Sequence, residues 1–170
     1  SVGKYISGNL ISKGTIIQTL QFIDTTSRST ASSTPQEGYT TPDIYIRKNS
    51  HLYLHVNIPF RNDGTVWGGS YHLFDFKVNV AIGSVPANTW VTFSNSGYHM
   101  TDTKDIFTYT NQYYLPFNIS QDFIIQFRHR YKPYNAGGAL LHINGNHDLH
   151  TYNDPNLLQF GFSVQNLGYS

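Results

Sequence analysis

The feature that most constrains the fold is a strict alternation of apolar and more polar residues between positions 51 and 60. The apolar set is Leu52, Leu54, Val56, Ile58 and Phe60. A period of two puts these side chains on one face of an extended strand, whereas an α-helix would spread them around its circumference. The segment therefore predicts a β-strand with one face in a core.

Other segments of the chain have the same character and are bounded by turn residues. They lie at 14–23, 44–47, 74–80, 90–93, 106–109, 123–131, 140–143 and 157–164. We expect the strands at 51–60 and 74–80 to form one long hairpin across the turn residues 61–64. The Ser-, Thr- and Pro-rich stretch from Asp24 to Pro42 predicts a long exposed loop.

Composition agrees with strands and disfavours helices. The chain has 13 Tyr and 11 Phe residues, which suit a pleated, half-buried surface, and its only Glu is Glu37. About eight or nine short strands at this spacing predict an all-β fold, a jelly-roll-like antiparallel β-sandwich. We expect one domain over residues 1–170, with residues 1–13 as a connecting arm from a longer protein.

The charge balance excludes two classes of partner. The formal net charge is +1 and only 12% of the residues are charged. Such a chain has no broad basic field for nucleic acid or an anionic membrane, so we expect neither as a partner. It has no Cys and no apolar run long enough to span a bilayer.

Catalytic motifs are missing from the sequence. Acid–base glycosidase chemistry requires two carboxylates close together, whereas Glu37 lies in a polar segment and the Asp residues are scattered. There is also no serine-nucleophile elbow and no glycine-rich phosphate loop. We therefore expect a protein that is not an enzyme and has no catalytic residues.

A histidine cluster is the one candidate for a cofactor site. His142, His147 and His150 lie within nine residues, and imidazole is a ligand for Zn, Ni and Cu. A divalent metal ion held there, at a symmetry axis between chains, is one hypothesis, and a cupin-like metalloenzyme is another. The alternatives are exposed His residues in the turn that Asn144 and Gly145 predict, or His packed on aromatic neighbours.

Aromatic residues near turns are the stronger binding signal. Sugar rings stack on Tyr and Trp, while Asn, Asp and Gln bind their hydroxyl groups. The candidate ligand-binding residues are Trp67, Tyr71, Tyr113, Tyr114, Tyr134 and Tyr152. Arg128 and Arg130 share one face of a strand, where a salt bridge is favoured over an anion site.

The segment Lys13-Gly14-Thr15-Ile16-Ile17-Gln18-Thr19-Leu20-Gln21, followed by a Ser/Thr-rich stretch and by Leu52-Tyr53-Leu54-His55-Val56, carries a resemblance. It resembles the C-terminal modules of marine and cyanobacterial phage tail fibres and virion structural proteins. The resemblance implies a jelly roll of the tumour-necrosis-factor or C1q type, trimeric assembly at the tip of a stalk, and a place in the virion. It also implies either a glycan ligand on a host cell surface or a purely architectural role.

Two functional hypotheses follow. The strand from Ile16 to Ile23 is apolar on both faces, which favours a homotrimer in which one sheet of each copy packs around a three-fold axis. In this hypothesis the domain is a receptor-binding fibre tip. The alternative is a carbohydrate-binding module of a larger enzyme or lectin, which would have the same strands and aromatic residues.

Overall fold

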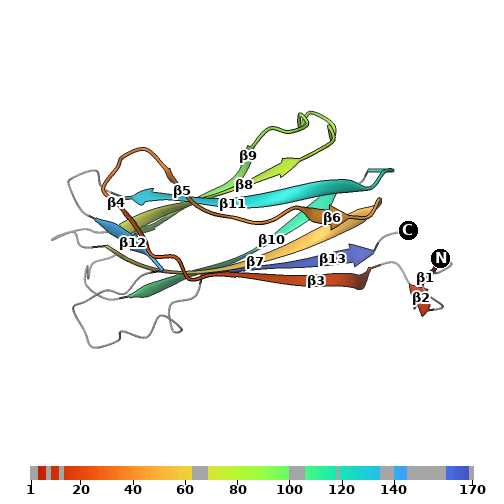
Figure 1. The fold of residues 1–170 in the computed structure, drawn as a ribbon, viewed down its shortest axis with the longest axis horizontal. Coiled ribbons are helices and arrows are strands. Elements are labelled where there is room, and N and C mark those ends of the chain that lie inside the picture. The colour runs from red at the N-terminus through yellow and green to blue at the C-terminus, as the bar shows by residue number, and fades with distance from the viewer. Residues whose placement is uncertain are drawn as a thin grey trace.

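The computed structural model describes residues 4–6, 9–11, 14–62, 69–99, 106–117, 119–134, 140–144 and 160–168. These residues form antiparallel strands and no helix (Figure 1). The strands are β1 (Lys4–Ile6), β2 (Asn9–Ile11), β3 (Thr15–Asp24), β4 (Arg28–Thr30), β5 (Gln36–Thr40), β6 (Ile44–Ile46), β7 (Ser50–Asn62), β8 (Gly69–Val78), β9 (Val91–His99), β10 (Phe107–Phe117), β11 (Phe123–Pro133), β12 (Leu141–Ile143) and β13 (Phe160–Gly168).

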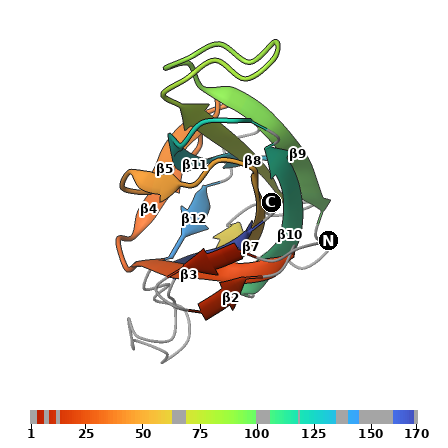
Figure 2. The ribbon, with the colours of Figure 1, turned by 90° about the vertical axis from the view of Figure 1, so that its right-hand side faces the viewer.

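Two sheets make up the body of the protein. The six-stranded first sheet has the order β3-β13-β7-β12-β4, with β10 on the other side of β7. The five-stranded second sheet has the order β5-β11-β8-β9, with β6 also paired to β11. Figures 1 and 2 show the two sheets facing each other across one interior.

The path of the chain is that of a jelly roll. It passes from β3 and β4 in the first sheet to β5 and β6 in the second and back to β7 in the first. It then passes to β8 and β9 in the second sheet, β10 in the first, β11 in the second, and β12 and β13 in the first. The first and last long strands, β3 and β13, lie side by side. This wrapping in two sheets is the jelly-roll pattern. The prediction of an all-β, jelly-roll-like antiparallel sandwich is confirmed.

Strand β7 is at the centre of the first sheet. It pairs with β10 along Ser50 to Phe60 and with β13 along Ser50 to Asn57. The apolar residues at its even positions from Leu52 to Phe60 are all 0% exposed, so the predicted alternation is confirmed.

Aromatic rings fill the space between the sheets. The largest fully buried rings are Phe60, Phe74, Phe123, Phe127, Phe160 and Phe162. Phe162 of the first sheet lies 5.9 Å from Phe74 and 6.4 Å from Phe127 of the second, measured between ring centroids. One continuous core therefore joins the two sheets.

The predicted loop from Asp24 to Pro42 is wrong in part, because it contains β4 and β5. β5 adds to the edge of β11, and β4 adds to β12. Tyr39 turns its ring onto Phe160, 5.6 Å away, and Gly38 lies so close to His129 that a Cβ would sit 2.9 Å from its Nδ1 atom. These pairings depend on strands far along the chain, so local composition did not reveal them.

The predicted hairpin between 51–60 and 74–80 is also wrong. β7 and β8 belong to different sheets and pair with other strands. Both strands still turn their apolar residues inward, with Phe74 and Val78 0% exposed. The two apolar faces cover each other across the interior instead of lying side by side in one sheet.

Strands β9 and β10 are longer than predicted. The sequence indicated strands at 90–93 and 106–109, whereas β9 extends to His99 and β10 extends to Phe117. Their extensions contain polar residues that weaken the sequence signal for a strand. Tyr113 and Tyr114 therefore lie within a strand and not in a turn.

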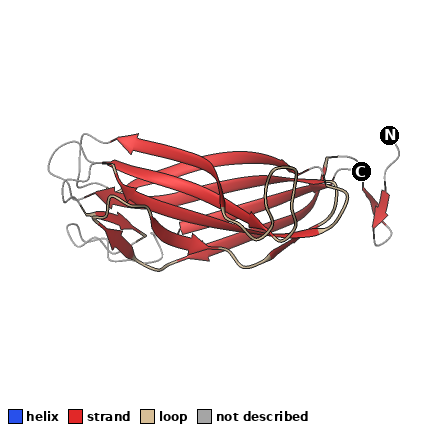
Figure 3. Ribbon diagram, turned by 90° about the horizontal axis from the view of Figure 1, so that it is seen from above, coloured by secondary structure: helices blue, strands red, loops and turns tan. Residues whose placement is uncertain are grey.

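A small hairpin of β1 and β2 precedes the sandwich. Its strands pair with each other, and Figure 3 shows it beyond the end of the two sheets. The single domain with residues 1–13 as a connecting arm remains a prediction. Within the described ranges there is no helix that is long and apolar enough to cross a membrane.

Replacing Phe162 with Ala should destabilise the protein by about 3–5 kcal/mol, because it leaves a cavity where both sheets meet. Urea unfolding followed by near-UV circular dichroism measures this loss. Gln165→Ala on the same strand points outward and is the control, with an expected effect below about 0.5 kcal/mol. Equal losses in the two variants would contradict the packing described above.

Candidate functional site

The outer face of the first sheet is the candidate site, and four cross-strand rows build it. Odd-numbered residues of β7 point to this face, because the even-numbered residues point into the core. From β3 through β13 and β7 to β10, the rows are Ile23, Gly161, Asn57 and Thr110; Gln21, Ser163, His55 and Gln112; Thr19, Gln165, Tyr53 and Tyr114; and Ile16, Leu167, His51 and Pro116.

No residue in these rows is Asp, Glu, Lys or Arg. The rows instead carry amides, hydroxyl groups, imidazoles, tyrosines and two isoleucines. Ile16 is 51% exposed and Ile23 is 48% exposed, both on the outermost strand β3. We call this surface the uncharged face.

Two tyrosines form its most prominent feature. Tyr53 is 42% exposed and Tyr114 is 46% exposed, with ring centroids 5.2 Å apart. The Tyr114 hydroxyl group is hydrogen-bonded to Nδ1 of His51, and the two rings meet edge to face at 5.4 Å. Fixed rings with exposed faces are suited to stacking against a flat apolar partner.

Beside Tyr53 the uncharged face is hollowed into a shallow groove of about 700 Å³. Its lining is both polar and apolar. The polar residues are Thr19, Gln21, Tyr53, His55, Gln112, Ser163 and Gln165, and the apolar side chains are Ile16, Leu20, Leu54 and Leu167. Amide groups both donate and accept hydrogen bonds, so the groove presents neutral partners for hydroxyl or amide groups. Its volume lies in the usual range for ligand sites.

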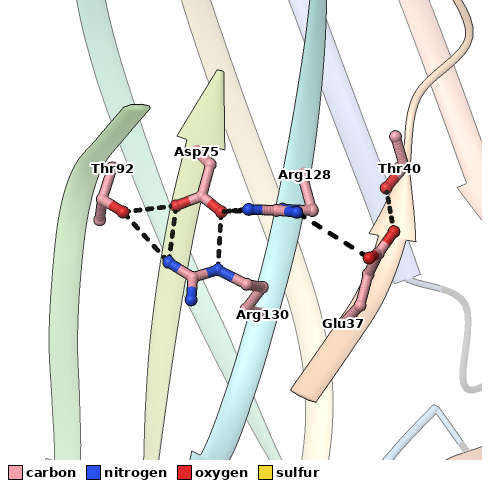
Figure 4. A network of polar contacts seen from close by, with 6 residues as sticks. All are labelled: Glu37, Thr40, Asp75, Thr92, Arg128 and Arg130. Carbon is pink, nitrogen blue, oxygen red and sulfur yellow. Dashed lines mark hydrogen bonds and ion pairs between the residues drawn. The ribbon is translucent and has the colours of Figure 1, made fainter. Parts of the chain in front are cut away.

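The outer face of the second sheet is different, because charged residues gather there. Asp75 of β8 is completely buried under Arg128 and Arg130 of β11 (Figure 4). Arg130 donates two hydrogen bonds to the carboxylate, at 2.7 and 3.0 Å, and Arg128 donates from Nε at 2.8 Å. Thr92 donates a further bond at 2.7 Å.

This network shows that Arg128 and Arg130 form a salt bridge with Asp75. Burial by itself raises the pKa of Asp75, but the hydrogen bonds from Arg130, Thr92 and Arg128 outweigh it and hold the pKa below its usual value. Arg128 also stacks over Trp90, with its guanidinium carbon 4.3 Å from the ring centroid. The favoured salt bridge is confirmed, and it lies within one chain.

The predicted ligand-binding residues do not form one site. Tyr71 and Tyr134 stack on each other on the second sheet, with centroids 4.9 Å apart, and Tyr114 lies on the uncharged face. Tyr113 turns inward, where Ser94 donates a hydrogen bond to its hydroxyl group at 2.9 Å and burial raises its pKa. Trp67 and Tyr152 lie outside the described residues.

The predicted metal site is only partly described. His142 is half-buried on β12 between Ser29 and Arg61, and His147 and His150 lie outside the described residues. In the part of the chain that is described, no group of three His, Cys, Asp or Glu side chains is placed to hold a metal ion. The metal site remains a prediction.

Sequence reasoning missed the residues of the groove. Alternation already placed His51, Tyr53 and His55 on a face away from the core. It could not show that Gln112 and Gln165 lie next to them, because these neighbours come from strands more than 50 residues away.

Together, the strand order and the two outer faces define a jelly-roll sandwich with four uncharged rows on one sheet and the Asp75 network on the other. No protein-family model and no curated protein sequence matches the chain. Similar solved structures come from infectious bursal disease virus.

The structure of the Gt strain of this virus is 13% identical, with a TM-score of 0.43, and the match covers 98% of this chain and 42% of that one. The T=1 particles derived from the virus are 12% identical, with a TM-score of 0.44 and coverage of 98% and 40%. The VP2 subviral particle is 12% identical, with a TM-score of 0.42 and coverage of 98% and 41%. The chain thus spans about two fifths of these virus proteins.

Replacing Asp75 with Ala should lower stability by about 2–3 kcal/mol, because the hydrogen bonds to both guanidinium groups are lost and two positive charges face each other. Chemical unfolding at neutral pH measures the loss. Asp43→Ala removes an exposed carboxylate and is the matched control, expected to change little. An Asp75 variant as stable as the control would show that the network is dispensable.

Proposed function

We propose that this domain is a non-catalytic structural module of a virion that assembles as a homotrimer and recognises a glycan on the host cell surface. The observation that carries the proposal is the uncharged face, with exposed isoleucines along one edge and a groove lined by polar and apolar side chains. The virion setting follows the sequence resemblance to phage fibre modules, and the non-catalytic role follows the missing catalytic motifs.

Assembly is supported by the edge of the first sheet. In the described residues β3 pairs only with β13, so the backbone groups along its outer edge are available to another strand. β3 has no Pro, Lys or Arg to discourage such pairing, and Ile16 and Ile23 are exposed on it. Depletion of charge together with aromatic residues is also typical of the centre of protein interfaces.

Glycan recognition is supported by the groove. Tyr53 offers a ring for the apolar face of a sugar, and Gln112 and Gln165 offer amides to its hydroxyl groups. No Lys or Arg lies in its four rows, so a neutral glycan fits them better than a sialylated or sulfated one. Nucleic acid is disfavoured for the same reason, because its phosphates require Lys or Arg.

The homotrimer predicts a mass of three times 19.3 kDa in light scattering at micromolar concentration. Changing Ile16 and Ile23 to Lys should shift the protein to monomer, because charge on the β3 edge opposes pairing. Ile106→Lys is the control, since Ile106 is also exposed, at 40%, but lies away from β3. A wild-type monomer would refute the proposed assembly.

An array of neutral, sialylated and sulfated oligosaccharides tests recognition. We expect binding to neutral members, weakened about tenfold by Tyr53→Ala through loss of one stacking surface. The matched control is Tyr71→Ala, which removes a tyrosine from the opposite sheet. Loss of binding in the Tyr71 variant alone would place the site on the stacked Tyr71 and Tyr134, and no binding would leave an architectural module.

A carbohydrate-binding module of a larger enzyme or lectin is the second candidate, and the groove favours it equally. Oligomeric state separates the two. A monomer that binds neutral sugars through Tyr53 would support the carbohydrate-binding module, and a trimer would support the virion module.

A further inference from the structure

Two histidines of the second sheet lie in the middle of the core. His72 of β8 and His129 of β11 are both 0% exposed. Nδ1 of His72 and Nε2 of His129 share a hydrogen bond of 3.0 Å, and Nε2 of His72 is bonded to the Ser70 hydroxyl group at 2.8 Å. Polar groups placed so deeply are costly unless they are satisfied.

Aromatic rings from the first sheet enclose the pair. The His72 ring stacks on Tyr109 of β10 at 4.7 Å and meets Phe60 of β7 at 5.1 Å. The His129 ring meets Phe160 of β13 edge to face at 5.2 Å. The imidazoles therefore form part of the contact between the two sheets.

The hydrogen-bond pattern requires neutral rings. A shared bond between two imidazole nitrogens needs one donor and one acceptor, and an imidazolium ring has only donors, so the two rings cannot both be charged. If either ring is charged, His129 carries a proton on Nδ1, because a neutral His129 that accepts a hydrogen bond at Nε2 is protonated at Nδ1. Nδ1 of His129 is buried without a hydrogen-bond partner, and Gly38 of β5 packs against it. A proton added there would have no acceptor within the described structure.

The groups around the pair do not compensate a positive charge. The ring of Tyr109 of β10 stacks on His72, the ring of Tyr131 of β11 stacks on His129, and Arg28 of β4 is the charged group that acts on His129. The Asp24 carboxylate of β3 is ion-paired with Arg28. Burial lowers the pKa of His72 to about 3, and burial, His72 and Arg28 together lower that of His129 well below its usual value.

We propose that the His72 and His129 pair is an acid-sensitive lock: neutral imidazoles close the contact between the sheets, and mildly acidic solution favours the opened chain, in which alone they take up protons. This proposal does not depend on the proposed function. It follows from two buried bases that hold their geometry only without a proton.

The sign of the effect follows from linkage. Above a pH of about 6.5 both imidazoles are neutral in the folded and unfolded chain, and the full stability is present. Below it, only the unfolded chain takes up the protons, so stability falls as the pH falls toward the lowered pKa values. From pH 7 to pH 5 the folding equilibrium constant should drop about 25-fold for each imidazole, or roughly 600-fold for the pair.

Carboxylates act in a different pH range. Asp24 and Asp75 have a pKa below the usual value, although burial by itself would raise it, because hydrogen bonds to arginines outweigh burial. Their contribution to stability is present above a pH of about 4 and is lost below it. The interval from pH 7 to pH 5 therefore isolates the histidines.

Urea unfolding between pH 7 and pH 5 tests the lock. The wild type should lose roughly 600-fold in the folding constant, and His72→Phe should lose only about 25-fold, since one buried imidazole remains. His55→Gln on the uncharged face is the matched control and should keep the wild-type dependence. A wild type whose stability does not change over this interval would overturn the proposal.

A measurement on the unaltered protein covers the case in which His72→Phe does not fold. The ring carbons of the eight histidines are followed by NMR during an acid titration of the folded chain. We expect two imidazoles that stay neutral until the tertiary signals of the fold are lost. If all of them titrate near their usual value while the fold persists, the lock does not exist.

Discussion

The contact between aromatic rings of the two sheets is the interaction on which the rest of the structure depends. Phe162 of the first sheet contacts Phe74 and Phe127 of the second. The inward-facing apolar residues of β7 add further fully buried side chains to this contact. Without this layer neither sheet would be stable, because each needs the other to cover its apolar face. The uncharged face and the outer face of the second sheet lie on opposite sides of this one contact.

Polar groups enter the buried part of the fold in two ways. Asp75 is completely buried, but two arginines and Thr92 satisfy it, so it stabilises the second sheet as a carboxylate. The His72 and His129 pair is satisfied only when it is neutral. The first arrangement requires an ionised group and the second requires neutral ones, so acid weakens the two clusters in different pH ranges.

Sequence patterns predicted the strands whose faces differ strongly. The even positions from Leu52 to Phe60 and the inward residues Phe74 and Val78 are buried as expected. The patterns failed for β5, where Gly38 and Tyr39 are placed by contacts with β11 and β13, and for the extension of β10 through Tyr113 and Tyr114. In these segments the burial of a residue depends on which strand lies beside it, and composition carries no record of that neighbour.

By itself, the sequence determined the β class and the inward and outward faces of the main strands, because these depend on side-chain chemistry and a period of two. Only the tertiary structure decided which outward residues meet. It placed Tyr53 beside Tyr114, aligned Gln112 and Gln165 along the groove, and brought His72 to His129, each through pairing between strands distant along the chain. Strand register is a global property of packing, so these sites appear only once the sandwich has closed.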